Sequence, residues 1–211
     1  SYALPAPGES PQLDPIVRGW REEFEKKFGA IGESDLTTEK IPLDWTCGPA
    51  RVIDVRSLVG STKERQWPAS PEITPAHVQA FEKQKGSLQP GEIVIFHTGH
   101  VAKHLHPAPR DTGMWADPLA GQSEGWPAPG PETILYLKEK GIRCLATDAP
   151  DLGGVDPQRA LATYWALGSR QMVGVEFLSN VEQIPEDAYF LFAALKIRDL
   201  HGGPGRAIVL Y

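Results

Sequence analysis

Residues 92–100 read EIVIFHTGH, an apolar run that ends in a polar turn. The central letters IVIF contain no polar residue, so a strand formed here would be covered on both faces. Covered strands are typical of α/β proteins, which pack helices against a largely parallel sheet. Thr98 and Gly99 then favour a turn at the end of the strand, with His97 before it and His100 after it. The stretch therefore predicts an α/β fold with two histidines at one edge of the sheet.

Similar strands recur along the chain. Five more short runs are rich in apolar and β-branched residues: ARVIDV (50–55), IRCLATD (142–148), MVGVEFL (172–178), AYFLFAAL (188–195) and RAIVLY (206–211). Several of these runs lack alternation between polar and apolar residues, which again indicates strands with two covered faces.

Four helices are predicted before and between these strands. The first begins at Asp14, and its apolar stripe consists of Ile16, Val17, Trp20, Phe24 and Phe28. The other three begin where a capping residue precedes proline, at Thr74, Gly130 and Asp156. The pattern predicts a loop and amphipathic helix over residues 1–35. It also predicts one α/β domain over residues 36–211, with a central mixed β-sheet flanked by helices.

The composition excludes several classes of protein. The chain has 211 residues, of which 41% are hydrophobic, and a net charge of −6, so it can bury a core and is not expected to bind nucleic acid. No apolar run approaches the length of about 18 residues that suggests a membrane span. Cys47 and Cys144 stand far apart without a metal-binding spacing. We expect them to pack in the core of a cytoplasmic protein.

One long connection, residues 106–131, carries no predicted helix or strand. Loops longer than about 12–15 residues are uncommon in compact domains and often serve as lids or binding loops. Trp115 and Trp126 have rings suited to covering a pocket. The alternative is a segment that packs along the surface or against another subunit.

Four of the six histidines lie within ten residues, at positions 97, 100, 104 and 106. Their spacings of three, four and two match no established zinc pattern, and between His97 and Asp111 this stretch contains no carboxylate to orient an imidazole. His104 and His106 are expected further along the loop. We therefore interpret His97 and His100 as pocket-lining side chains, and we do not expect the four histidines to form a metal centre by themselves.

Carboxylates are the other candidate site residues. Glu176 interrupts the apolar run 172–178, where burying a charge is costly unless it is paired or bound to a metal. The alternative is a carboxylate that faces water at the edge of the sheet. Asp148 and Asp151 follow another predicted strand and either act in a site or cap the next segment.

The order of the segments then becomes informative. GPARVIDV, EIVIFHTGH, LATDAPDLGGVDP, VEFLSNVEQIP and GRAIVLY together resemble the cyclase family of metal-dependent hydrolases, from about residue 36 to the end of the chain. The resemblance implies a swivelling β/β/α-like fold. It also implies hydrolysis of a cyclic amide, a lactone or an N-formyl amide by water bound to zinc or manganese, because a bound divalent ion lowers the pKa of water.

The resemblance is incomplete at the residues that carry the chemistry. Glu176 matches the metal-binding glutamate of the family, but Tyr164, or Thr163 if the alignment shifts by one residue, stands where the family has a metal-binding histidine, and neither replaces an imidazole well. His100 falls on an aromatic position and is assigned to the pocket. The signature His-x-Gly-Thr-His-x-Asp-x-Pro-x-x-His is absent. The chain therefore resembles the C-terminal two-thirds of a family member, and its catalytic residues are not assigned.

Three hypotheses remain open. The chain is a hydrolase acting on a small molecule, with its site completed by a companion chain or another copy; or it is a non-catalytic binding or assembly module; or the histidines of residues 97–106 have rebuilt a metal site. In the first two hypotheses this chain alone holds no metal. In the first we also expect association with other chains, because missing strands leave sheet edges exposed.

Overall fold

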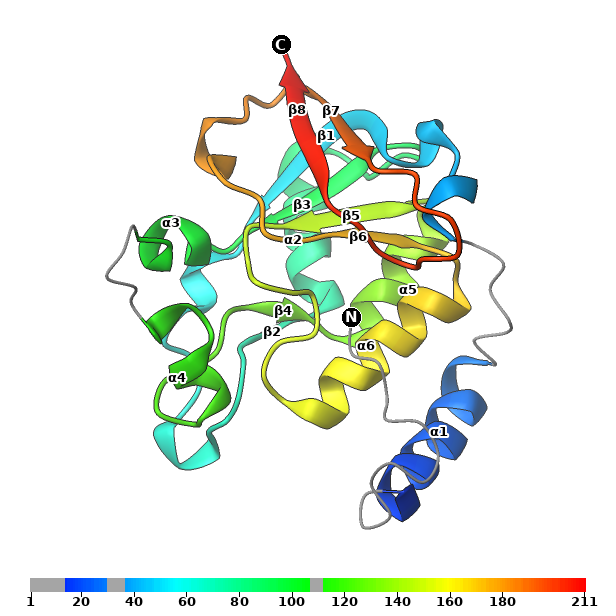
Figure 1. The fold of residues 1–211 in the computed structure, drawn as a ribbon. Helices are drawn as coiled ribbons and strands as arrows, with labels where there is room; N and C mark the ends of the chain where they lie inside the picture. The colour runs from blue at the N-terminus through cyan, green and yellow to red at the C-terminus, as the bar shows by residue number, and fades with distance from the viewer. Residues whose placement is uncertain (1–13, 30–36, 107–111) are drawn as a thin grey trace.

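The structure, a computed structural model, describes residues 14–29, 37–106 and 112–211. Its centre is a six-stranded mixed sheet with the order β6-β5-β3-β1-β7-β8 (Figure 1). The strands of this sheet are β1 (Cys47–Asp54), β3 (Ile93–His97), β5 (Cys144–Thr147), β6 (Val173–Val175), β7 (Tyr189–Ala194) and β8 (Gly205–Leu210). The first four run parallel, whereas β7 pairs antiparallel with β1 and with β8. The predicted α/β domain with a mixed central sheet is confirmed.

All four predicted helices are present. They are α1 (Asp14–Phe28), α2 (Pro75–Lys85), α5 (Pro131–Glu139) and α6 (Pro157–Ser169). The side chain of Asp156 accepts a hydrogen bond from the backbone N–H of Arg159 at 2.7 Å, which satisfies one of the free donors at the start of α6. Within the described residues, no helix is long and apolar enough to cross a membrane.

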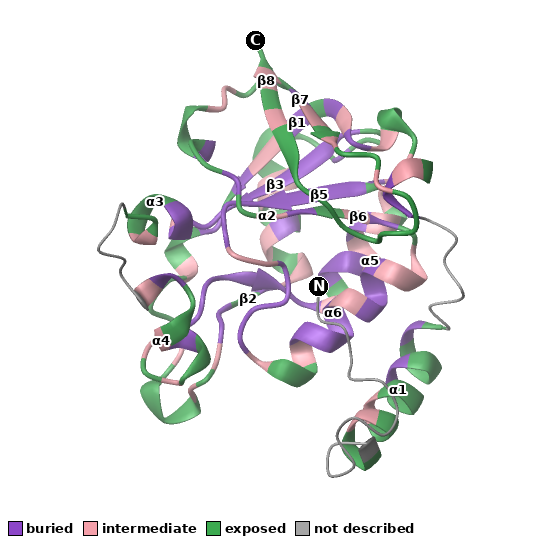
Figure 2. Cartoon of the chain, viewed as in Figure 1, coloured by how far each residue is buried: buried purple, intermediate pink, exposed green. Residues whose placement is uncertain are grey.

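The two faces of the sheet are covered by different elements (Figure 2). Phe96 and Leu145 point toward the helices, where they belong to one core with Ile134 of α5 and Trp165 of α6. The opposite face packs under the curled β7–β8 hairpin and the segment before it; its core residues include Ile95, Ala146, Val175, Leu178, Val181 and Phe190. This two-sided cover is why β3 and β5 are buried at every position.

Helix α1, predicted as an amphipathic helix, packs against this core through Phe24 and Phe28. Phe28 is buried, and the ring centroids of Phe24 and Trp165 are 6.1 Å apart. The indole N–H of Trp165 also donates to the carbonyl of Gly29 at 2.9 Å. The amphipathic stripe predicted that α1 buries one face, but it did not identify α6 as the partner.

The long connection contains more structure than predicted. It holds a 3-10 turn at Thr112–Met114, the short helix α4 (Ala116–Leu119) and strand β4 (Ala128–Pro129), while residues 107–111 lie outside the described residues. Strand β4 pairs in parallel with β2 (Glu72–Ile73) in a second, two-stranded sheet. Two-residue strands leave no readable periodicity, so the sequence pattern missed them.

Candidate functional site

The candidate site lies where the parallel strands end. The carboxyl ends of β1, β3, β5 and β6 share one edge of the sheet, and ligands of α/β folds bind outside that edge. His97 is the last residue of β3, Asp148 directly follows β5, and Glu176 directly follows β6. The structure therefore brings the predicted histidine and carboxylates to the same edge.

Asp148 holds the turn after β3. Its buried carboxylate accepts hydrogen bonds from the backbone N–H of Thr98 (2.6 Å), from the Thr98 hydroxyl (2.7 Å) and from the N–H of Gly99 (2.8 Å). Gly99 has a φ of +74°, a left-handed conformation that glycine adopts without strain. The Nε2 atom of His97 lies 3.9 Å from Asp148 Oδ2. Asp148, which follows β5, therefore stabilises the turn after the neighbouring strand β3 and does not cap the segment that follows β5.

His100 begins a helix that was not predicted, α3 (His100–His104). Its Nε2 lies 2.7 Å from the carbonyl oxygen of Met114, so this nitrogen carries the proton that is donated. The His100 ring packs against His104 and Trp126, at centroid distances of 4.6 and 5.4 Å. His104 thus lies at the end of a helix and not in the predicted loop, while His106 is exposed. The imidazole of His100 is therefore held in place by its hydrogen bond to Met114 and by its ring contacts with His104 and Trp126.

The environment of His100 leads to a pH-dependent stability. Burial lowers its pKa from 6.5 to about 4. The unfolded chain therefore takes up a proton on His100 at a higher pH than the folded chain does. We expect stability to fall as the pH drops from about 6.5 to about 4, by up to about 3 kcal/mol. Urea unfolding at several pH values measures this.

A matched pair of variants isolates the contribution of His100. His100→Gln retains an N–H donor for Met114 but does not titrate. The free energy of unfolding of this variant should therefore depend less on pH in this range. His106→Gln removes an exposed histidine and should leave the dependence unchanged. If the free energy of unfolding of His100→Gln depends on pH as steeply as that of the wild type, another group is responsible.

Glu176, which lies just after β6 and is half-buried, is paired. Its Oε1 accepts hydrogen bonds from the Tyr164 hydroxyl of α6 (2.5 Å) and from the backbone N–H of Leu152 (3.1 Å). Burial and the nearby carboxylates of Glu176 and Asp151 raise the pKa of Tyr164. Tyr164 therefore stays protonated and donates to Glu176.

Asp151 lies beside this pair. Its Oδ1 accepts from the backbone N–H groups of Gly153 (2.8 Å) and Gly154 (2.7 Å). Burial raises the pKa of Asp151 to about 6, and the negative charge of Glu176 adds to the rise, while these hydrogen bonds oppose it. Two carboxylates thus share a partly buried site at the end of the sheet.

The two tryptophans of the long connection differ in placement. Trp126, whose ring was considered suited to covering a pocket, is buried. Its indole N–H donates to the carbonyl of Asp151 (3.1 Å) and approaches the Asp151 carboxylate (3.2 Å), while its ring contacts His100. Trp126 therefore joins the histidine turn to the carboxylate cluster.

Trp115 remains at the surface, with 47% of its area exposed. Its ring lies 6.1 Å from that of Phe177, the residue next to Glu176. Phe177 was not predicted as a site residue; it is 41% exposed and has a φ of +65°, which is strained for an aromatic residue. The only signal in the sequence that Phe177 belongs to the site was its position next to Glu176.

The residues at this site do not by themselves fit the metal that the family resemblance implies. Within the described ranges, no group of three or more His, Cys, Asp or Glu side chains lies close enough to hold an ion. Glu176 and Asp151 offer two carboxylates, but the neighbouring side chain is the protonated phenol of Tyr164, which is a poor ligand.

The fold and the site define a class of protein: an α/β domain with titratable residues gathered at the carboxyl ends of its parallel strands. The sequence profile of the cyclase family matches residues 23–153. The chain belongs to the cyclase family, which confirms the family inferred from the order of its segments.

Two curated relatives are hydrolases. The isatin hydrolase of Roseibium aggregatum is 28% identical over 89% of this chain and 75% of its own length. The kynurenine formamidase of Salinibacter ruber is 28% identical over 82% of this chain and 66% of its own length. A crystal structure of an isatin hydrolase bound to the product analogue thioisatinate superimposes with a TM-score of 0.67 and 24% identity, over 85% of this chain and 66% of that chain. This chain thus spans 66–75% of the length of these three relatives.

Proposed function

We propose that this chain forms the larger part of a cytoplasmic cyclase-family hydrolase, which cleaves a cyclic amide, a lactone or an N-formyl amide. The observation that carries the proposal is the position of Glu176, beside Asp151 and fixed by Tyr164, at the carboxyl edge of a cyclase-family sheet. The substrate class is supported by the names of the relatives, isatin hydrolase and kynurenine formamidase.

The chain's own residues supply part of the site. Glu176 and Asp151 present carboxylates, and the exposed rings of Trp115 and Phe177 offer a flat apolar surface near Glu176 in the chain. Zinc or manganese, the ions implied by the family, would supply activated water. Such an ion would need further ligands, which we assign to a polypeptide segment bearing the histidine-rich family signature.

A second candidate function is a non-catalytic binding or assembly module. The hydrogen bond from Tyr164 to Glu176 favours this candidate, because it satisfies the carboxylate without any other ligand.

Hydrolysis assays separate the two candidates. The 211-residue chain is assayed with isatin and with an N-formyl arylamine, alone and mixed with a polypeptide carrying the signature, in the presence of zinc or manganese. A hydrolase is expected to show turnover in the mixture and little in the chain alone. If the mixture forms a complex but stays inactive with both substrates, the chain is a binding module.

The metal content of the chain is a separate prediction. Purified chain, dialysed without chelator, should contain much less than one equivalent of zinc or manganese, because two carboxylates and a phenol make an incomplete site. Metal analysis combined with intact mass measures this. Stoichiometric metal that is lost in the His100→Gln variant would instead favour a site rebuilt from the histidines.

We also expect the chain to associate, with another copy or a companion chain. Strand β8 is an edge of the sheet, and its Ile208 and Leu210 are 42% and 57% exposed. An exposed apolar edge invites a partner. Sedimentation at micromolar concentration should show more than a monomer, and a monomer that persists when the signature polypeptide is added would contradict this.

A further inference from the structure

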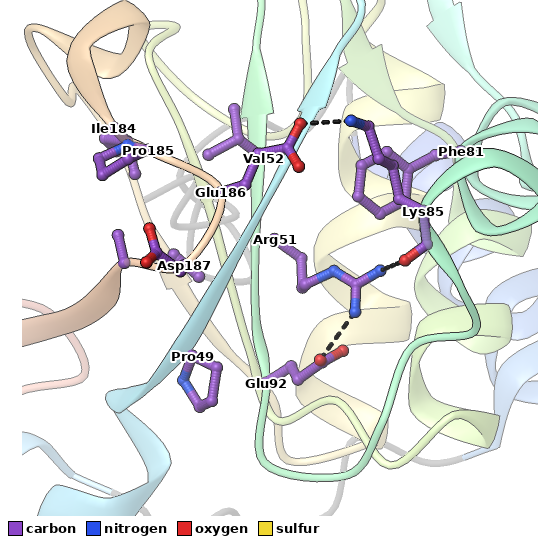
Figure 3. A pocket seen from close by; sticks show the side chains of 12 residues that line it. Pro49, Arg51, Val52, Phe81, Lys85, Glu92, Ile184, Pro185, Glu186 and Asp187 are labelled. Carbon is purple, nitrogen blue, oxygen red and sulfur yellow. Dashed lines mark hydrogen bonds and ion pairs between the residues drawn. The ribbon is translucent and has the colours of Figure 1, made fainter. Parts of the chain in front are cut away.

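A cavity of about 290 Å³ beside β1 is lined by charges that are paired within the chain (Figure 3). Lys85 of α2 pairs with Glu186 across the cavity. Arg51 of β1 donates to Glu92 and to the carbonyls of Lys85 and Gly86, each at 2.9 Å. These interactions satisfy the basic groups of α2 and β1 that face the cavity. The end of the sheet at β8 is different.

Strand β8 (Gly205–Leu210) is the last strand of the central sheet, with no neighbour on its outer side among the described residues. Natural proteins usually protect such edges with proline, charges or a β-bulge. Strand β8 reads GRAIVL, with a single charge at Arg206 and no proline. Its ladder with β7 runs without a bulge through all six residues. The edge is therefore open to pairing with another strand.

The ladder with β7 determines which backbone groups of β8 face outward. The N–H of Leu195 donates to the carbonyl of Pro204 at 3.0 Å, just before the first residue of β8. Bonded and non-bonded pairs alternate along an antiparallel ladder, so every second residue of β8, beginning with Arg206, bonds to β7. Ala207 and Val209 therefore direct their N–H and C=O groups away from β7. In the described part of the chain, no hydrogen bond reaches these groups.

Both faces of β8 are apolar. On the inner face, Ala207 and Val209 line a cavity of about 180 Å³ together with Leu178. On the outer face, Ile208 and Leu210 are 42% and 57% exposed. Apolar residues on both faces are typical of a strand inside a sheet and not of an exposed edge. The composition of β8 thus indicates a covered strand.

A second copy of the chain fits this edge. Two identical strands that pair across a twofold axis perpendicular to the sheet run antiparallel. With the axis at Ile208, Ala207 lies opposite the partner's Val209, and the outward backbone groups of both form a bonded pair. Arg206 then lies opposite the partner's Leu210. The single charge of each strand does not meet its copy, and the arginine stem covers the leucine.

The same pairing covers the segment that follows the candidate site. The cavity behind Ala207 and Val209 is also lined by Leu178 and Asn180, which follow Glu176 in the chain. A twofold axis perpendicular to the sheet keeps the inner faces of both copies on one side. The partner's Ala207 and Val209 therefore extend the apolar wall of this cavity across the axis.

We propose that two copies of the chain pair through β8, antiparallel and with the twofold axis at Ile208, so that two six-stranded sheets become one continuous sheet. Hydrogen bonds between Ala207 and the partner's Val209 supply the backbone contact. Ile208 and Leu210 supply the apolar contact on the outer face. The pairing goes beyond the proposed function and does not depend on hydrolysis.

Charge substitution at Ile208 tests the register. Ile208→Lys and Ile208→Glu each place like charges opposite one another at the axis, so each variant alone should dimerise at least about ten-fold more weakly than the wild type. An equimolar mixture of the two variants should recover the dimer, because opposite charges then meet. Sedimentation of the full 211-residue chain at micromolar concentration measures the dimer. Leu119→Lys, at an exposed leucine of α4, is the control and should dimerise like the wild type.

Three results of the sedimentation would overturn the proposal. The first is a wild-type chain that stays monomeric at micromolar concentration. The second is a dimer that Ile208→Lys and Ile208→Glu leave unchanged. The third is a mixture of two folded variants that recovers no dimer, because the axis then does not lie at Ile208.

Hydrogen exchange tests the same pairing in the unmodified chain. The amides of Ala207 and Val209 should exchange rapidly in dilute solution and at least about ten-fold more slowly where the dimer predominates. The amide of Ile208 bonds to β7 and should be protected under both conditions, so it is the internal control. Exchange at Ala207 and Val209 that does not change with concentration would overturn the proposal, even if the variants at Ile208 do not fold.

These measurements use no substrate, so failure of the pairing is distinguishable from failure of the proposed function. A chain that gains mass only when another polypeptide is added would contradict the β8 dimer and leave the hydrolase unaffected. A β8 dimer that shows no turnover in the hydrolysis assays would support the pairing and contradict the hydrolase.

Discussion

Glu176→Gln should lower kcat/KM by about 100-fold or more in the mixture of the chain with the signature-bearing polypeptide, while the fold remains intact. Glutamine has nearly the same shape, and its oxygen still accepts from Tyr164 and from the N–H of Leu152. What disappears is the negative charge beside Asp151. Steady-state kinetics of the mixture, with circular dichroism as the check on folding, measures the effect.

Glu139→Gln is the matched control. It makes the same chemical change at an exposed glutamate at the end of α5 and should retain wild-type activity. If Glu176→Gln is as active as this control, Glu176 has no part in hydrolysis. If it loses activity together with stability, its role is structural.

Asp148→Ala should reduce the free energy of unfolding by about 3 kcal/mol. The variant leaves the N–H groups of Thr98 and Gly99 and the Thr98 hydroxyl without their acceptor in a buried place, and each unsatisfied group costs about 1–3 kcal/mol, part of which water entering the gap recovers. Urea unfolding measures the change.

Two variants calibrate that measurement. Asp148→Asn keeps one acceptor oxygen and should show an intermediate loss. Asp44→Ala removes an exposed aspartate and should change stability by less than about 0.5 kcal/mol. A value for Asp148→Ala that matches Asp44→Ala would mean that the turn does not depend on the carboxylate.

The sheet was predictable because the residues of its central strands are almost all apolar. The uninterrupted apolar residues that make up most of β3 and β5 indicated two covered faces, and the structure has helices on one face and the β7–β8 hairpin on the other. The docking of α1 was not predictable, since an apolar stripe states that a face is buried but not which helix covers it. The two-residue pairing of β2 with β4 was too short to leave a pattern.

The site was predictable where burial makes a residue conspicuous. A charge in an apolar strand singled out Glu176, and the physical rule that such a charge needs a partner is met by Tyr164. The partners of Trp126 were not predictable, because the sequence left open whether its ring covers a pocket or packs along the surface. Its indole N–H contacts Asp151, which lies 25 positions further along the chain.

The order in which the chain is made sets a limit on how it folds. Helix α1 is synthesised well before α6, yet the residue that follows α1, Gly29, accepts a hydrogen bond from Trp165 of α6 that spans 136 positions. Strand β1 likewise waits for β7, which lies close to the C-terminus. On the ribosome, the apolar stripe of α1 remains uncovered until α6 has emerged, and one edge of β1 remains uncovered until β7 has emerged. Contacts so distant in sequence slow folding and prolong the exposure of apolar surface to aggregation.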